Sequence, residues 1–339
     1  MGEAVSGSMK HIDFTFIDHE EAGRLTPDIG EILDIVEAGL RAHGKGDVVL
    51  PPKSHIHLDD RYNGHFNVLM GYVGPLETAG VKVIGDYVDN YEHDLPSEIA
   101  LLTLYDPRTG VPLCIMDATT LTWLRTGAVT GIGARWLARP DARVLAHIGA
   151  RGTAFTNIRA IAHVRPIKEV RINSKRPETR EALAHRVEQE LGINVLPVGS
   201  VEEAVAGADI VVEATRLESR QVLVRDDMIK PGGLLVTYGW VMAVDPALPL
   251  RADKFIVDDW EQCCKGGTFH PLIEAGKLSR QQLHAEIGGI VCGARPGRER
   301  EDERIVFWHR GFAVSDIVLG QAMFERAKAE GVGRSLRLW

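Results

Sequence analysis

Short runs of alternating apolar and polar residues occupy the stretch between residues 48 and 105. The runs are VVLPPKSHIHL, HFNVLMGYV, GVKVIGDYV and EIALLTLYD. Because successive side chains of a strand point to opposite faces, this alternation predicts strands of a mixed or antiparallel sheet. The polar residues 106–110 then separate EIALLTLYD from VPLCIMD. They predict a hairpin turn in which Gly110 adopts a positive φ.

Helical periodicity appears on both sides of these runs. In DIGEILDIVEAGLRAHGKG, apolar residues recur every three or four positions from Ile29 to Leu40. Thr26 is expected to cap this helix, with Pro27 in its first turn and glycine at its end. The segment SDIVLGQAMFERAKAEG near the C-terminus predicts another helix. Because the apolar side chains of that closing helix need a partner, we expect it to return to the first domain.

A long helix is predicted after Asp117, over ATTLTWLRTGAVTGIGARWLAR. Gly127, Gly131 and Gly133 lie inside it, and each mid-helix glycine costs roughly 1 kcal/mol relative to alanine. We therefore expect these glycines to allow close packing against another backbone, at the start of the next domain.

From residue 141 onward, strand and helix patterns alternate. The predicted strands include ARVLAHIG, KEVRINS, INVLPV, ADIVVEAT, GGLLVTYG and DKFIVDD, with a final strand near RIVFWHRG. Such alternation is typical of a parallel, doubly wound sheet. The sequence thus predicts an α/β protein. It would combine a Rossmann-type domain over residues 138–310 with a discontinuous α+β domain over residues 10–137 and 311–339.

The segment VLAHIGARGTAFTNIRAIAH predicts a strand, a tight glycine turn and a helix. Glycines at such a turn let backbone amides approach a pyrophosphate, and the helix N-terminus favours its charge. Arg151 occupies the usual place of a glycine, so an ordinary βα loop is the alternative interpretation. The candidate cofactor-binding residues are Gly149, Arg151, Gly152, Thr153 and Ala154 here, and Thr215 after a later strand.

The residues after the second strand of this domain bear on the choice of nucleotide. NAD-binding domains place a carboxylate there, whereas a 2′-phosphate requires a cation. Ser174, Lys175 and Arg176 follow the strand, and Glu169 lies at its start and is not assigned. This favours NADP(H), with NAD(H) possible. The alternative is a solvated basic turn.

Composition and charge limit the possible partners. The chain has 339 residues, a net charge of −8 and no block of basic residues, which argues against nucleic acid or a membrane surface. No apolar run is long enough to span a bilayer, and the N-terminus has no signal-peptide pattern. We therefore expect a cytoplasmic protein with a small-molecule partner. MGEAVSGS, before Met9, is interpreted as a disordered lead or expression-vector remnant.

The cysteines and histidines do not form a recognisable metal motif. Four cysteines show no C-x-x-C spacing, so we expect reduced, mostly buried thiols. His55 and His57 alternate along SHIHLDD, with His65 nearby, and could in principle ligate a metal. A pocket wall or a solvated strand edge is the preferred interpretation, and no metal is predicted.

Several of these segments together resemble the ornithine cyclodeaminase/mu-crystallin family, over nearly the whole chain. They are AGVKVIGD, LPSEIALLTLYDPRTGVPLCIMDATTLTWLRTGAVTGIGARWLAR, IGARGTA and GFAVSDIVLG. The resemblance implies a homodimer in which the discontinuous domain supplies dimer contacts and substrate residues. It also implies hydride exchange at the Cα of an amino acid or its imine.

The resemblance also implies roles for individual residues. Lys82 matches the family lysine beside the reacting carbon, and Arg125 the arginine that holds the substrate carboxylate. Ser97 occupies the place of a threonine beside the substrate, and Lys53 that of a substrate-binding arginine. Asp316 is interpreted as structural.

His93, beside Asp94, is a further candidate proton donor and substrate-binding residue. The expected pocket wall, which would suit a polar or acidic substrate side chain, consists of His55, His57, His65, Tyr87 and Trp240.

The sequence departs from ornithine cyclodeaminase itself at two acidic positions. FNVLMGY and the turn after LLVTYG lack the acids that the resemblance associates with cyclisation. We therefore predict an NAD(P)-dependent imine reductase or amino-acid dehydrogenase. A cyclodeaminase remains an alternative if Asp86 or Asp245 substitutes for the missing acids. A non-catalytic NADPH-dependent binder of a small ligand is the other alternative.

Overall fold

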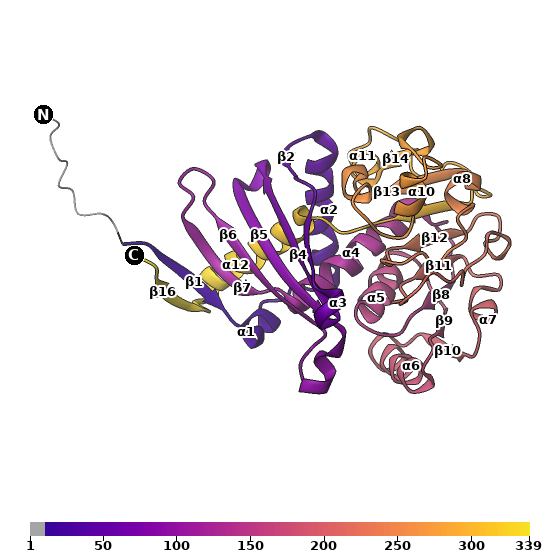
Figure 1. Cartoon of the computed structure of the whole chain (residues 1–339), viewed down its shortest axis with the longest axis horizontal. Helices are drawn as coiled ribbons and strands as arrows, with labels where there is room; N and C mark the ends of the chain where they lie inside the picture. The colour runs from indigo at the N-terminus through magenta and orange to yellow at the C-terminus, as the bar shows by residue number, and fades with distance from the viewer. Residues whose placement is uncertain (1–10) are drawn as a thin grey trace, which may run out of the picture.

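Two eight-stranded sheets lie side by side and form the frame of the protein (Figure 1). The structure is a computed structural model that describes residues 11–339, apart from the side chains of Val88 and Tyr91. The N-terminal sequence interpreted as a lead lies outside the described residues. The predicted combination of a doubly wound sheet with an α+β part is confirmed.

The first sheet has the strand order β16-β1-β7-β6-β5-β4-β2, with β3 paired to β4. Its strands are β1 (Asp13–Ile17), β2 (Val48–Val49), β3 (Ser54–His57), β4 (Gly64–Val73), β5 (Thr78–Tyr87), β6 (Glu98–Tyr105), β7 (Pro112–Asp117) and β16 (Arg334–Arg337). Strands β4 to β7 pair antiparallel, as the alternation predicts, while β1 pairs parallel to β7. Gly110 has a φ of 73° in the expected hairpin turn.

Helices precede, connect or follow the strands of this sheet. They are α1 (His19–Arg24), α2 (Ile29–Lys45), α3 (Asp59–Tyr62), α4 (Thr119–Leu137) and α12 (Ala313–Glu330), with short 3-10 turns η1 (Gly74–Leu76) and η2 (Val88–His93). The closing helix α12 packs against β4, β5 and β6, as its apolar side chains require. The predicted cap of α2 was wrong. Asp28 accepts from the Glu31 amide at 2.9 Å, so Thr26 and Pro27 precede the helix.

The second sheet is parallel, in the order β10-β9-β8-β11-β12-β15-β13-β14. Its strands are β8 (Val144–Ile148), β9 (Glu169–Asn173), β10 (Asn194–Val198), β11 (Ile210–Glu213), β12 (Leu234–Thr237), β13 (Lys254–Val257), β14 (Ala285–Glu286) and β15 (Ile305–Trp308). The helical elements between them are α5 (Ala154–Val164), α6 (Pro177–Leu191), α7 (Val201–Val205), η3 (Asp226–Met228), α8 (Leu248–Arg251), α9 (Trp260–Cys263), α10 (His270–Glu274), η4 (Arg280–Gln282) and α11 (Ile287–Val291). The strand of this sheet that comes last in the sequence, β15, is inserted between β12 and β13. The loop after β15 therefore emerges near the middle of the sheet.

The glycine-rich helix α4 joins the two halves. A Cβ added to Gly127 would lie 2.7 Å from Thr156, and one added to Gly131 would lie 2.7 Å from Ala160. Both neighbours belong to α5, the helix that follows the glycine turn. The expected close packing is thus confirmed, and it fixes α4 against the start of the second sheet.

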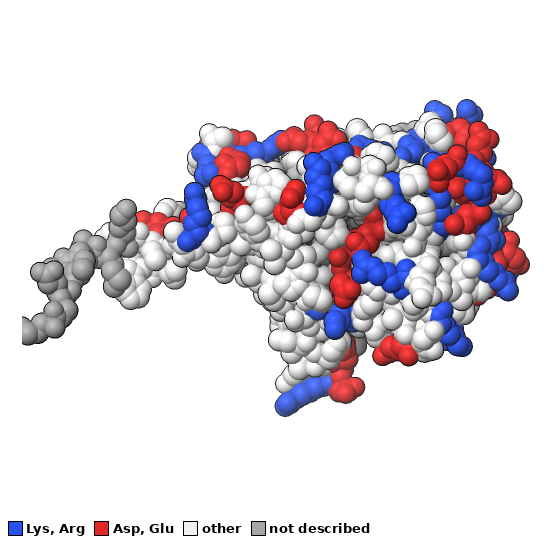
Figure 2. Space-filling model, turned by 90° about the horizontal axis from the view of Figure 1, so that it is seen from above, with Lys and Arg blue, Asp and Glu red and all other residues white. Residues whose placement is uncertain are grey.

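The surface agrees with the charge pattern of the sequence. On the face shown in Figure 2, basic and acidic side chains are interspersed and form no large patch of one sign. Among the described helices, none has both the length and the apolar character needed to cross a bilayer.

Candidate functional site

Three charged side chains meet on the face of the first sheet that α12 covers. Lys82 Nζ donates to Asp316 Oδ1 at 2.6 Å, and Arg125 Nε donates to the same oxygen at 2.9 Å. Lys82 also donates to Thr122 Oγ1 at 3.1 Å. The side chains of Lys82 and Asp316 are 1% and 0% exposed. Interpreting Asp316 as merely structural was therefore incomplete, because this residue contacts both catalytic candidates.

Each of these residues comes from a different element. In β5, Lys82 lies on the inward face with Ile84, while Val83 between them is exposed. Arg125 lies in α4 and Asp316 in the first turn of α12. The inward face of a strand normally holds apolar residues, so a lysine there needs a charged partner from another element.

The pKa of Lys82 is lowered to about 8, first by burial and then by the neighbouring charge of Arg125, which together outweigh Asp316. Two of the three ammonium protons are donated to Asp316 and Thr122, which leaves one donor. Lys82 can therefore act as a proton donor near neutral pH.

Gly311 lies in close contact with the guanidinium of Arg125. It has a φ of 70°, and a Cβ there would overlap Arg125 Nη1. The two terminal nitrogens of Arg125 have no hydrogen-bond partner among the described residues, yet they are not among the fully buried unpaired atoms. They are therefore accessible, and a guanidinium fork of this kind suits a carboxylate.

Sequence reasoning did not identify Glu98, the first residue of β6. Burial and then Asp86 raise its pKa, opposed by Lys82 and Arg125. Trp123 Nε1 donates to its carboxylate at 3.1 Å. In the sequence, the alternation through EIALLTLYD places Glu98 on the same face as Leu102, and this pattern could have identified it as facing Lys82.

Lys53 also lies within this region. Its Nζ donates to the carbonyl of Arg310 at 2.7 Å, and its backbone amide donates to Gln262 at 2.9 Å. Burial and then the charge of Arg310 hold the pKa of Lys53 well below its usual value, and Arg125 and Lys82 act in the same direction. The structure thus brings together three of the five predicted catalytic and substrate residues.

The other two, Ser97 and His93, are exposed. The carbonyl of Ser97 accepts from Tyr87 N at 2.8 Å. Neither side chain forms a hydrogen bond or ion pair with Lys82 or Arg125 among the described residues, so their roles remain predictions.

The glycine turn after β8 has the geometry of a phosphate-binding loop. Gly149 has a φ of 101°, and a Cβ there would lie 2.7 Å from the carbonyl oxygen of Ala214. Gly152 has a φ of 54° and open space around its Cα, and Arg151 is exposed. Ala154, the first residue of α5, is buried. The turn therefore leaves room for a pyrophosphate at the start of α5.

A buried polar network connects this turn to the cation cluster. Thr153 Oγ1 and Asn157 Nδ2 each lie 2.6 Å from the hydroxyl of Tyr238. The Tyr238 ring stacks on His309, with centroids 4.6 Å apart. Burial lowers the pKa of His309 to about 3, and the charges of Arg125 and Lys53 add to this effect. The glycine turn, Tyr238 and His309 thus follow the carboxyl ends of the parallel strands β8, β12 and β15, the edge of the sheet at which α/β proteins bind ligands.

The remaining cofactor candidates lie at two other strand ends. Thr215 follows β11, but its amide donates to the buried Glu213 at 2.8 Å and its hydroxyl donates to the same carboxylate. Its side chain is therefore engaged within the protein. After β9, Ser174 Oγ donates to the carbonyl of Arg176 at 2.9 Å, and Lys175 and Arg176 are exposed.

The two acids that could replace those of a cyclodeaminase have local partners. Asp86 pairs with Arg216 at 2.7 Å, and Asp245 accepts from the Ala247 amide at 2.8 Å. Within the described part of the chain, neither forms a hydrogen bond or ion pair with Lys82.

The expected pocket wall forms a ring cluster around Trp240, to which His55, His57 and His65 lie within 5.2 to 6.1 Å between centroids. Tyr87 instead packs against Phe66. The described residues contain one group that could hold a metal ion, formed by His43, Asp259 and Glu286. His43 Nε2 and Asp259 Oδ2 are 3.1 Å apart, so an ion pair across the two halves accounts for that contact.

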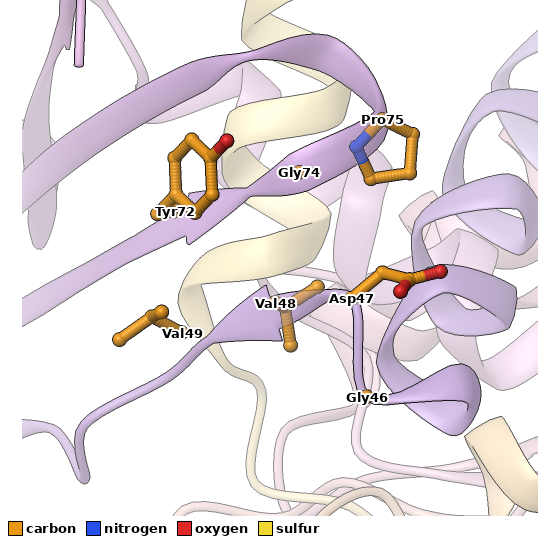
Figure 3. Close-up of a pocket in the computed structure, with 7 residues that line it drawn as sticks. All are labelled: Gly46, Asp47, Val48, Val49, Tyr72, Gly74 and Pro75. Carbon is orange, nitrogen blue, oxygen red and sulfur yellow. The ribbon is translucent and has the colours of Figure 1, made fainter. Parts of the chain in front are cut away.

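An open pocket of about 440 Å³ lies elsewhere, between the end of α2 and the turn after β4 (Figure 3). Its walls include Val49, Tyr72 and Pro75. None of its lining residues belongs to the cation cluster or to the glycine turn, so we do not assign the site there.

The fold and the site define an α/β protein of two sheets, with a glycine turn after β8 and a buried cation cluster. The chain belongs to the ornithine cyclodeaminase/mu-crystallin family, whose model matches residues 18–331. Alanine dehydrogenase of Archaeoglobus fulgidus is 30% identical over 317 residues, which cover 91% of this chain and 94% of that protein.

Two solved structures are similar over nearly the full length. Thermococcus litoralis Δ(1)-pyrroline-2-carboxylate reductase in complex with NADH and L-proline has a TM-score of 0.89 and 28% identity, covering 95% of this chain and 100% of its own. An archaeal alanine dehydrogenase dimer with bound NAD has a TM-score of 0.88 and 28% identity, covering 97% and 100%. These similarities confirm the predicted family and fold.

Proposed function

We propose that this protein catalyses hydride exchange between NAD(P)(H) and the Cα of an α-imino or α-amino acid. The observation that carries the proposal is the pair of contacts from Lys82 and Arg125 to one oxygen of Asp316. Two cations on one carboxylate leave a single positive charge, which complements the carboxylate of an amino acid. The relatives described above act on such compounds and support this assignment.

In the proposed reaction, bound NAD(P)H supplies the hydride that adds to Cα. Arg125 holds the substrate carboxylate with its two free nitrogens. As the C=N π bond breaks, the substrate nitrogen gains a proton from Lys82 Nζ, which is reprotonated from solvent. In the oxidative direction Lys82 takes the proton back. Orientation of the imine by Arg125 supplies much of the rate, since near-attack positioning can contribute about 7–11 kcal/mol.

The direct test measures NADPH and NADH consumption with ammonia and a panel of 2-oxo acids. Lys82→Met and Arg125→Met should each lower kcat/KM by at least about a thousandfold, as expected for groups that contact the reacting substrate. The exposed Lys168→Met and Arg220→Met serve as matched controls. Activity that survives both site substitutions would refute the mechanism. Ammonia release without nucleotide turnover would indicate a cyclodeaminase, and nucleotide binding without any turnover a ligand-binding protein.

For the cofactor, we propose a preference for NADP(H). Asn173 and Ser174 end β9 without a carboxylate, and the exposed Lys175 and Arg176 have no ion-pair partner among the described residues. A 2′-phosphate would be attracted to these cations. Ser174→Asp should lower the ratio of kcat/KM for NADPH to that for NADH at least about tenfold, or about 1.4 kcal/mol. An unchanged ratio would contradict the assignment.

We further propose a homodimer built by the discontinuous domain, residues 10–137 and 311–339, with residues 138–310 as the dinucleotide domain. The outward face of the first sheet supports a dimer contact because Val83, Ile99 and Leu101 are 40%, 44% and 49% exposed. The dimeric alanine dehydrogenase is consistent with it. Light scattering of the purified protein should give twice the chain mass, and Leu101→Lys should favour the monomer.

A further inference from the structure

A second group of unpaired polar atoms lies next to the cation cluster. Nε and Nη2 of Arg310 are buried without a hydrogen-bond partner among the described residues, and so is Nε2 of His55. Lys53 lies close to both, and its Nζ makes one hydrogen bond, to the Arg310 carbonyl. A buried guanidinium without a partner is costly, because neither water nor protein satisfies its donors.

The position of Arg310 is fixed by its surroundings. A Cβ on Gly267 would lie 2.5 Å from Arg310 Cδ, and one on Gly266 would lie 2.9 Å from the ring of Trp240. Both glycines have positive φ values, 148° and 98° for Gly266 and Gly267. Arg310 Cζ lies 4.7 Å from the Trp240 ring centroid. Gly266 and Gly267 therefore leave room for the Arg310 side chain, which packs against the indole of Trp240.

The acid nearest to Arg310 does not neutralise its side chain directly. Asp258 Oδ2 accepts from the backbone amides of Arg310 and Gly311 at 2.7 and 2.6 Å, and no ion pair to the guanidinium is present among the described residues. Asp258 thus fixes the backbone of this loop. The guanidinium nitrogens Nε and Nη2 remain unpaired, and the charge of Arg310 acts on both Lys53 and His55.

The electrostatics of Lys53 and His55 agree with a concentration of positive charge. Burial and then Lys53 lower the pKa of His55 to about 4. Burial and then Arg310 lower that of Lys53, and Arg125 contributes as well. The charges of Arg310 and Arg125 therefore both act on Lys53. An anion placed beside Lys53 and Arg310 would relieve this repulsion.

We propose that the substrate carries a second carboxylate at the end of its side chain and that Arg310, assisted by Lys53, binds it. This inference rests on the proposed function, in which Arg125 holds the α-carboxylate. The substrate class is then an acidic α-imino acid and its amino-acid product. Trp240, which is 45% exposed, lies over the guanidinium.

The test compares substrates that differ in charge but hardly in shape. Two pairs of amino acids are assayed in the oxidative direction with NADP⁺ and NAD⁺. The first pair is L-aspartate and L-asparagine, and the second is L-glutamate and L-glutamine. For at least one pair, the acid should exceed its amide by at least about a hundredfold in kcat/KM, because the amide cannot pair with the guanidinium charge.

Variants of Arg310 test the assignment to this residue. Arg310→Met removes the guanidinium but retains the carbonyl that accepts from Lys53, and it should reduce the acid-to-amide ratio to below about fivefold. Arg310→Lys restores the charge without the fork and should give an intermediate ratio. The exposed Arg295→Met, on the same half of the protein, should leave the ratio unchanged. Thermal unfolding and NADPH binding establish that each variant is folded.

The outcomes separate the two proposals. If no amino or imino acid supports nucleotide turnover, the proposed function fails. If neutral amino acids are oxidised as well as acidic ones, or if the acid-to-amide ratio is the same in Arg310→Met as in the wild type, only the second carboxylate site is refuted.

Discussion

Lys82 and Arg125 donate to the same oxygen atom, Asp316 Oδ1, at 2.6 and 2.9 Å. The two cations come from β5 and α4, and the acid comes from α12 near the end of the chain. This single carboxylate therefore joins β5, α4 and α12. It also leaves one net positive charge in a buried place, which is the physical basis of the proposed carboxylate site.

Replacing Asp316 should show how much its negative charge contributes to the stability of the folded protein. Asp316→Asn leaves two buried cations without a counter-charge, so we expect the free energy of unfolding to fall by about 3–5 kcal/mol. Urea denaturation followed by circular dichroism measures this change. Asp60→Asn, at an exposed position, is the control. Equal stability of the two variants would show that Asp316 does not compensate the cations.

Lys82 should titrate near neutral pH. Burial and the charge of Arg125 lower its pKa to about 8, so ¹³Cε resonances of labelled lysines should include one that titrates near pH 8 and disappears in Lys82→Met. Reduction needs the protonated form of Lys82. The kcat/KM for reduction, calculated with the concentration of the imine itself, should therefore fall as pH rises through 8. Oxidation needs the neutral amine and should increase over the same range. A reduction rate that is constant from pH 7 to 9.5 would contradict this role.

Gly311→Ala should disturb the site chiefly through Arg125. The φ of 70° is unfavourable for alanine, and the added Cβ would displace Arg125 Nη1. We expect a KM for the amino acid that is at least about tenfold higher, since the displaced fork loses a charge-assisted contact. The affinity for NADPH, measured by fluorescence, should change little. Gly289→Ala adds a Cβ where nothing lies within 4 Å and should retain the wild-type KM.

Much of the first sheet and the nucleotide turn could be predicted because periodicity is a local property. The alternation in GVKVIGDYV places Lys82 on the inward face, and the glycines of α4 predict the close contact with α5. The resemblance then provided Arg125 and Lys53. Neither kind of reasoning identified how these residues meet, because Asp316 approaches them from the far end of the chain.

Long-range pairing also explains the elements that sequence reasoning missed. β16 forms only by pairing with β1, and its residues are all exposed, so its pattern has no buried face to detect. The position of β15 between β12 and β13 depends on tertiary order rather than on its own sequence. That order brings Arg310 to the site. A lone arginine after a strand does not by itself indicate a binding residue, and only the burial of its unpaired nitrogens does.

The buried His147 beneath the nucleotide turn should make the protein sensitive to mild acid. Its Nδ1 donates to the carbonyl of Gly149 at 2.7 Å, and its Nε2 accepts from Asn157 Nδ2 at 3.0 Å, so the ring is neutral. Burial lowers its pKa to about 4 from an ordinary value of 6.5. In the unfolded chain His147 takes up a proton below pH 6.5, whereas in the folded protein it does so only near pH 4. Its contribution to stability is therefore complete above pH 6.5 and is lost as pH falls toward 4.

The expected loss is up to about 1.4 kcal/mol per pH unit in this range, the value for one proton bound only by the unfolded state. Urea unfolding at intervals from pH 7.5 to 4.5 measures it. His147→Gln should be less stable at pH 7.5 but should lose stability less steeply on acidification, while the exposed His185→Gln should follow the wild type. Parallel curves for His147→Gln and the wild type would exclude His147 as the titrating group. Because a proton on Nε2 removes the acceptor of Asn157 Nδ2 in α5, protonation should also weaken NADPH binding, and that loss should be absent from the pH dependence of His147→Gln.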